Sequence, residues 1–89
     1  MKPIARRNDL LVQRDTPELF IEDLLNRKHI RLNPTSAYVW ERCDGKKETY
    51  EIAAEMADEL GVSVSEGVVL MALNHLYYER LLEPAAQFA

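Results

Sequence analysis

Two histidines and a single cysteine are the residues whose chemistry would suit catalysis or metal binding. His29 lies in a predicted strand and His75 in a predicted helix, and neither has a histidine or cysteine partner at the spacing of a metal site. Cys43 lies near the end of a short predicted helix, where the helix dipole raises a thiol pKa and disfavours a nucleophile. We therefore expect the two histidines to be structural or surface residues and Cys43 to be packed in the core.

Acidic side chains are plentiful but indicate no acid-base pair. Along one predicted helix they form a run that is typical of a solvated face: Glu51, Glu55, Asp58 and Glu59. The three glycines of the chain are scattered, so they form no phosphate-binding loop. The sequence predicts a protein that is not an enzyme and has no catalytic residue, metal or cofactor.

The composition is that of one small soluble domain, residues 1–89. The chain has 47% hydrophobic and 29% charged residues, and its net charge of −4 disfavours binding to nucleic acid or to anionic membranes. No apolar run reaches the roughly 18 residues of a membrane span. A single cysteine fits the reducing cytoplasm, which we expect to be the location of the protein.

The first third of the chain predicts three short strands. Residues 9–14 form an apolar run that a turn containing proline closes, and residues 18–24 alternate between apolar and polar side chains. Residues 26–27 offer a tight reversal before residues 28–32, whose strict alternation is typical of a half-buried strand. A helix over residues 17–25 is the competing interpretation.

The next part of the chain predicts two helices. Asn33 and Pro34 are suited to begin the first, because asparagine caps free N–H groups and proline needs no donor at that position. Residues 44–45 end this helix. Thr49 is the expected cap of the second helix, and Gly61 ends it as a left-handed residue.

A third helix follows, beginning with a capping box of Ser63 and Glu66 and running to about Leu82. Residues 1–8 and 84–89 are expected to be loose termini. The predicted fold class is therefore α+β: a three-stranded antiparallel sheet followed by three helices, resembling a winged helix-turn-helix.

Because a helix-turn-helix is a common DNA-binding motif, one alternative function is that of a winged-helix transcription regulator. The second predicted helix carries four acids and no lysine or arginine, whereas it would have to lie across phosphates. The third helix begins without the Arg, Lys, Asn or Gln that reads base edges. We therefore expect no nucleic-acid partner.

The third predicted helix is too apolar to bury all of its side chains. A core-facing stripe would take Val69, Ala72, Leu73 and Leu76. Leu70, Tyr77 and Tyr78 cannot all face the same core, so some apolar surface should remain exposed. Such a surface indicates a partner site, and a homodimer or scaffold module is a further alternative.

The strand at residues 28–32 is expected to lie at the edge of the sheet, next to this helix. An edge strand has unpaired N–H and C=O groups, to which an extended peptide could add as a further strand. Lys28, His29, Arg31 and Arg80 would then favour acidic residues on that peptide.

The stretch from Leu32 to Gly45, which reads Leu-Asn-Pro-Thr-Ser-Ala-Tyr-Val-Trp-Glu-Arg-Cys-Asp-Gly, resembles the signature of the PqqD-like family. Residues 49–53, Thr-Tyr-Glu-Ile-Ala, and the Leu-Leu-Glu at residues 81–83 extend the resemblance over about residues 10–83. Members of that family commonly carry glycine near the end of the third helix, where this chain has Arg80.

This resemblance implies a recognition element of ribosomally made peptide natural products. Such a domain binds the leader of a precursor peptide as an added strand between its third strand and third helix. It presents the leader to a modifying enzyme, often a radical S-adenosylmethionine enzyme. Carried onto this sequence, the peptide-binding residues are Lys28, His29, Ile30, Arg31, Leu32, Leu70, Leu73, Asn74, Tyr77, Arg80 and Leu81.

Overall fold

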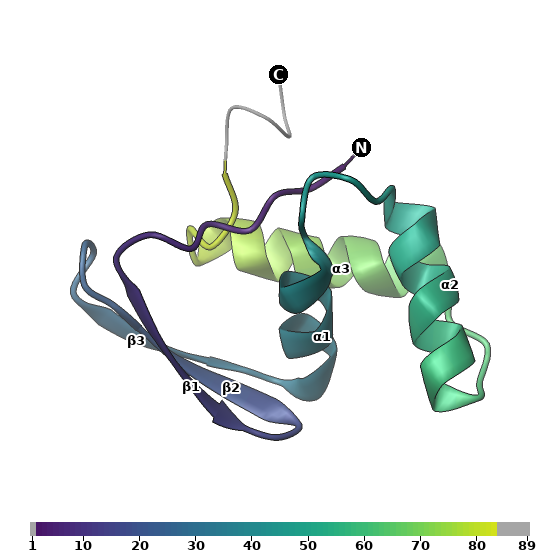
Figure 1. The fold of residues 1–89 in the computed structure, drawn as a ribbon, viewed down its shortest axis with the longest axis horizontal. Coiled ribbons are helices and arrows are strands. Elements are labelled where there is room, and N and C mark those ends of the chain that lie inside the picture. The colour runs from purple at the N-terminus through teal and green to yellow at the C-terminus, as the bar shows by residue number, and fades with distance from the viewer. Residues whose placement is uncertain (1, 84–89) are drawn as a thin grey trace.

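The computed structural model describes residues 2–83 and contains, within them, a three-stranded antiparallel sheet followed by three helices (Figure 1). The elements are β1 (Leu10–Asp15), β2 (Glu18–Asp23), β3 (Lys28–Leu32), α1 (Pro34–Arg42), α2 (Thr49–Leu60) and α3 (Glu66–Tyr78). The predicted α+β class and element order are confirmed, and β2 excludes the competing helix over residues 17–25. The expected loose tail at residues 84–89 lies outside the described residues.

β2 is the central strand of the sheet, because the spatial order is β1-β2-β3. Its inward-facing residues lie opposite those of β3, with Ile21 opposite Ile30 and Leu19 opposite Leu32. All four of these side chains are buried, since α1 packs against β2 and β3. α1 does not pack against β1, and five of the six β1 residues are exposed.

Trp40 of α1 lies at the centre of the core and is 2% exposed. Its ring nitrogen Nε1 donates a hydrogen bond to the carbonyl oxygen of Leu81, 3.1 Å away, which connects α1 to the chain after α3. The Arg7 guanidinium lies 4.2 Å from the centre of the indole ring and covers its other side. One aromatic side chain thus joins the N-terminal segment, α1 and the C-terminal segment.

The N-terminal segment differs from the expected loose terminus. Pro3 and Ala5 are buried, Ala5 N donates to the Cys43 carbonyl oxygen at 2.8 Å, and Arg6 N donates to the Leu81 carbonyl oxygen at 2.8 Å. These partners come from distant parts of the chain, so no local pattern in residues 1–8 indicated them. Only the packing of the three helices brings them together.

The helix ends were predicted in part. Gly61 ends α2 with φ of +69°, as expected, but the cap of α2 is Glu48, whose backbone N–H donates to the Glu51 carboxylate at 2.8 Å. Thr49 lies inside α2, and its hydroxyl donates to the carboxylate of Glu66. That contact occupies Glu66, so the predicted capping box with Ser63 is wrong, and α3 begins after Ser65.

α3 also ends at Tyr78, earlier than the predicted Leu82. Arg80 adopts φ of +58°, a left-handed conformation that stops the helix. The Leu81 N–H then donates to the carbonyl oxygen of Leu76 at 2.9 Å. This reversal turns Leu81 and Leu82 into the core, where both are buried.

The left-handed conformation of Arg80 predicts a stabilising substitution. We expect Arg80→Gly to raise the free energy of unfolding by up to about 1 kcal/mol, because glycine adopts positive φ without a clash of its Cβ atom. The carbonyl oxygen of residue 80, which accepts from Arg6, is retained. Arg80→Ala is the control, and urea denaturation measures both. Equal stability of the glycine and alanine variants would contradict this account.

Asp23 is a buried carboxylate at the end of β2, and Arg6 neutralises it. The guanidinium donates from Nη2 to Oδ1 at 2.8 Å and from Nη1 to Oδ2 at 3.1 Å. Backbone N–H groups of Leu25 and Asn26 also donate to Oδ1, at 3.1 and 3.0 Å. The Arg6 hydrogen bonds hold the pKa of Asp23 well below its usual range, outweighing the effect of burial.

This lowered pKa predicts an acid-sensitive contribution to stability. The contribution is complete above the unfolded-state pKa of about 4 and is lost as the pH falls toward the lower folded-state pKa. We expect Asp23→Asn to cost about 3 kcal/mol at pH 7, because Arg6 then lacks a charged partner. Denaturation of both proteins between pH 7 and pH 3 measures this difference, which should shrink toward pH 3. The exposed Asp58→Asn is the matched control.

Candidate functional site

The outer edge of β3 offers unpaired backbone groups. In the part of the chain that the structure describes, β3 pairs with β2 alone, so alternate residues direct N–H and C=O groups away from the sheet. Ile30 and Leu32 are 4% and 0% exposed, respectively. These two side chains anchor the strand in the core, which leaves the backbone as the accessible part of this edge.

One contact and one hollow relate β3 to α3. At the start of β3, Lys28 Nζ lies 3.2 Å from Glu79 Oε1, just after α3. Past the end of β3, a hollow of about 410 Å³ separates the start of α1 from α3; it is lined by Asn33, Thr35, Ser36, Val68, Met71, Ala72 and His75. We call the space between β3 and α3, from Lys28 to this hollow, the groove, although no β3 residue lines the hollow itself.

The α3 side of this groove is apolar at one end and charged at the other. Val68 and Met71 are 38% and 76% exposed, although both side chains are apolar. One turn later, His75 Nδ1 lies 3.3 Å from Ser36 Oγ, and His75 Nε2 lies 3.8 Å from Glu79 Oε2. The groove could therefore accept an apolar side chain near Met71 and a charged one near Lys28.

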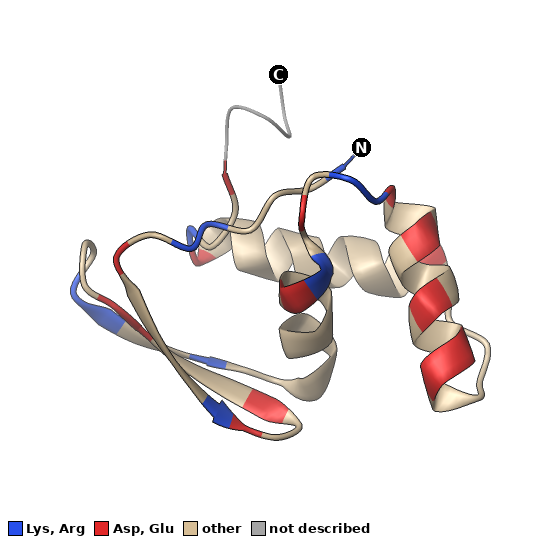
Figure 2. Ribbon diagram, in the orientation of Figure 1, with Lys and Arg blue, Asp and Glu red and all other residues tan. Residues whose placement is uncertain are grey.

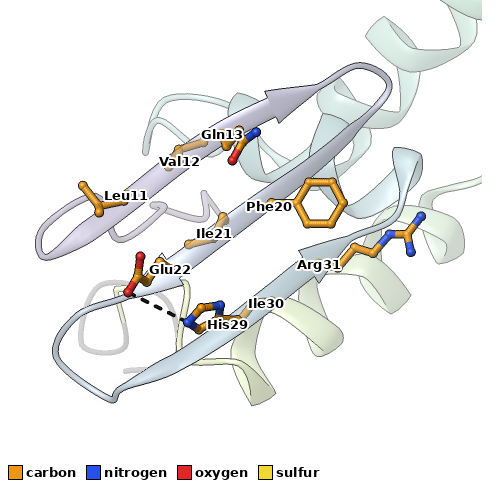
Figure 3. A pocket seen from close by; sticks show the side chains of 9 residues that line it. All are labelled: Leu11, Val12, Gln13, Phe20, Ile21, Glu22, His29, Ile30 and Arg31. Carbon is orange, nitrogen blue, oxygen red and sulfur yellow. Dashed lines mark ion pairs between the residues drawn. The ribbon is translucent and has the colours of Figure 1, made fainter.

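The predicted site residues on β3 point to two different sides of the sheet. Lys28 lies on the helix side and contacts Glu79, whereas His29 and Arg31 extend over the opposite face (Figure 3). There His29 lies 3.9 Å from a Glu22 carboxylate oxygen, and Arg31 stacks over the Phe20 ring. His29 and Arg31 therefore reach only the outer rim of the β3 edge.

That opposite face holds a shallow hollow of about 530 Å³, with Leu11, Val12, Gln13, Phe20, Ile21, Glu22, His29, Ile30 and Arg31 around it (Figure 3). Its exposed apolar side chains are Leu11 and Phe20, and ion pairs occupy its charged groups. It lies on the side of the sheet away from α1, so it is a separate surface from the groove beside α3.

The structure does not bring the predicted α3 residues together at the groove. Leu73 and Leu81 are 3% and 0% exposed and belong to the core. Successive residues of an α-helix turn by about 100° around its axis. The stripe of Leu70, Asn74 and Tyr77 therefore lies about 150° around α3 from the side that carries Val68 and His75. Arg80 and Tyr77 instead line a hollow with Arg6, Leu25, Asn26, Tyr78 and Leu82.

The groove residues that sequence reasoning missed are Val68, Met71, His75 and Glu79. They share one side of α3 because they are spaced by three or four residues. This spacing was visible in the sequence, but so was that of Leu70, Asn74 and Tyr77. Which of the two stripes faces β3 depends on the rotation of α3 about its axis.

The Cys43 thiol is buried and poorly suited to act as a nucleophile. Burial raises the pKa of the Cys43 thiol to about 12, and Sγ donates to the carbonyl oxygen of Val39 at 3.1 Å. Within residues 2–83, no cluster of three His, Cys, Asp or Glu side chains is arranged to hold a metal ion. The same residues include no helix with the length and apolar character needed to cross a membrane.

Charge is distributed unevenly over the molecule (Figure 2). Acidic side chains lie along α2, where Glu55 and Glu59 pair with Arg42 and Lys47. Cationic side chains lie along β3, away from α2 (Figure 2). Of the basic residues of β3, Lys28 lies on the helix side, so the groove combines one β3 cation with an apolar part of α3.

Comparison with known proteins agrees with the fold. The model of the family described as coenzyme PQQ synthesis protein D (PqqD) matches residues 18–82. The solved structure of TbiB1 in complex with the TbiA(beta) leader peptide is similar at a TM-score of 0.68, with 20% identity over 94% of this chain and 96% of that one. No curated protein matches. The residues that match the family model include β2, β3 and all three helices. The chain therefore belongs to the PqqD family.

Proposed function

We propose that this protein captures the leader segment of a ribosomally made precursor peptide, which adds as a strand to the outer edge of β3. The observation that carries this proposal is the unpaired β3 backbone beside the exposed apolar side of α3. Membership of the PqqD family supports it, as does the fold shared with a protein that was solved with a leader peptide.

In strand addition, backbone hydrogen bonds supply affinity and side-chain contacts supply specificity. Backbone hydrogen bonds to β3 supply affinity for any extended peptide, and each contributes about 0.5–1.5 kcal/mol net. Alternate peptide side chains would face α3, where Val68 and Met71 offer apolar contact. The spacing of apolar residues in the leader therefore determines which peptides bind.

Charge adds a second level of selection. Lys28 and Glu79 are each about one-third exposed, so an acidic leader residue could displace Glu79 from Lys28. His29 and Arg31 at the outer rim also favour acidic residues, although Arg31 already pairs with Glu18 at 2.8 Å. Because such partly exposed pairs are weak, we expect charge to modulate affinity by less than the apolar contacts do.

The role that fits this groove is presentation without catalysis. The domain would hold the leader while a separate modifying enzyme, such as a radical S-adenosylmethionine enzyme, acts on the rest of the precursor. No cofactor is needed for this role. The buried Cys43, with its raised thiol pKa, is unsuited to serve as a nucleophile.

DNA binding, the alternative from the helix-turn-helix, is not favoured by the surface charges. α2 has four acidic residues and no cation, and its acids lie along its exposed side (Figure 2). α3 begins with Glu66, Gly67 and Val68, which offer no side chain for reading base edges in the major groove.

The first experiment is a titration of the isotope-labelled 89-residue protein with synthetic leader segments from short reading frames encoded nearby. We expect chemical-shift changes in residues 28–32 and at Val68, Met71 and His75. Alternate β3 amides should also become protected from hydrogen exchange, because they gain a partner strand. No changes with any leader, together with clear changes on adding duplex DNA, would overturn the proposal in favour of a regulator.

A pair of substitutions on α3 separates the groove from the rest of the helix. We expect Met71→Glu to weaken leader binding at least tenfold, or about 1.4 kcal/mol, since it places a charge in the apolar part of the groove. Leu70→Glu is the matched control, because Leu70 is also exposed but lies outside the groove. Calorimetry measures both affinities. Equal losses in both variants, or a loss in Leu70→Glu alone, would place the peptide on the other side of α3.

A further inference from the structure

β1 is a second free edge of the sheet, on the side opposite β3. Of the residues described, only those of β2 pair with it, so its outer N–H and C=O groups have no strand partner. Leu11 and Val12, at its centre, are 57% and 41% exposed. Both faces of β1 therefore carry an exposed apolar side chain.

The exposure of Val12 follows from the position of α1. Val12 lies directly opposite Ile21 of β2 on the helix-facing side of the sheet, yet Ile21 is only 2% exposed. α1 covers β2 and β3 and does not extend over β1. The ion pair between Arg14 and Glu41 spans the gap at one end of the strand and leaves Val12 uncovered.

The two edges differ in charge, and this difference indicates what each one accepts. Natural sheets protect their edges against pairing with charged residues, proline or bulges. β3 carries Lys28, His29 and Arg31, so two β3 edges would bring cations together. β1 has no charged side chain from Leu10 to Gln13, and its pairing with β2 continues from Leu10 to Asp15 without a bulge.

We propose that β1 pairs with β1 of a second copy of this chain, in antiparallel orientation, and joins the two three-stranded sheets into one. A two-fold axis normal to the sheet brings residues of the same face opposite each other. With the axis at Val12, residues 10–14 pair. Val12 then lies opposite Val12 of the second copy, Leu11 opposite Gln13, and Leu10 opposite Arg14. All five of these residues belong to β1.

Neighbouring registers are less favourable. An axis at Gln13 would place Leu11 opposite Asp15 and Val12 opposite Arg14, which sets apolar side chains against charged ones. An axis at Leu11 would require Asp9 to continue the strand, but its φ of +59° interrupts the extended backbone. The Val12 register pairs one apolar residue type with a charged one, Leu10 with Arg14, and leaves Asp15 outside the pairing, so it has fewer such mismatches than the Gln13 register.

This dimer leaves both β3 edges free. Because the two-fold axis is normal to the joined sheet, the helices of both copies lie on the same side, and the β3 edges form its two outer margins. The interface is small compared with the roughly 800 Å² per partner of a stable complex, so we expect a dissociation constant in the micromolar range or weaker. The inference does not depend on what β3 binds.

Sedimentation velocity of the complete 89-residue chain between about 10 µM and 1 mM tests the proposal. We expect the wild type to shift from monomer toward dimer over this range. Val12→Lys should abolish the shift, because it places like charges directly opposite each other at the two-fold axis. Val12→Thr, which keeps a β-branched and uncharged side chain, should retain the dimer.

A second measurement does not depend on the substitutions. In a mixture of differently labelled copies of the wild type, nuclear Overhauser effects between the two Val12 backbones are expected. The wild-type protein remaining monomeric up to 1 mM would overturn the proposal. A second result would also overturn it: Val12→Lys still dimerises, and the chemical shifts that change with its concentration belong to Leu70 and Tyr77 on α3. Leader binding by Val12→Lys is tested separately, so loss of one property is distinguishable from loss of the other.

Discussion

The position of α3 relative to the sheet depends on the buried contact between Arg6 and Asp23. Besides its two hydrogen bonds to the Asp23 carboxylate, the guanidinium donates from Nη1 to the Arg80 carbonyl oxygen at 2.8 Å. Asp23 in turn accepts from the backbone of the β2–β3 turn at Leu25 and Asn26. One ion pair thus joins the N-terminal segment, the turn that leads into β3 and the end of α3, which together line the hollow beside Tyr77 and Tyr78.

The uneven coverage of the sheet by α1 gives each edge strand its own character. Because α1 packs over β2 and β3, the inward side chains of β3 are buried, and its accessible part is backbone beside α3. β1 lies outside this cover and keeps exposed apolar side chains on both faces. The charges then separate the two edges, since β3 is cationic and the centre of β1 is neutral.

The helix ends show where reasoning from the local sequence failed. Thr49 and Ser63 are good caps by residue type, but Thr49 bonds to Glu66 across the α2–α3 turn, and local rules do not include such a contact. Helical spacing also identifies two exposed stripes on α3, and the residues carried over from the family resemblance lie on the stripe of Leu70, Asn74 and Tyr77. The structure separates the two stripes, because Met71 and His75 line the hollow between α1 and α3, whereas Tyr77 lines the hollow with Arg6.

The sequence by itself determined the class and order of the elements, because alternation, helical spacing and Gly61 act over a few residues. It also indicated the family, through the motif that runs from Leu32 to Gly45. Only the tertiary structure decided the packing of residues 3–6, the ion pair of Asp23 and the side of α3 that meets β3. Each of these depends on contacts between residues far apart in the chain. Helical spacing did identify the buried stripe of α3, but which of the two flanking stripes meets β3 depends on how the whole helix is placed against the sheet, and local periodicity does not encode that placement.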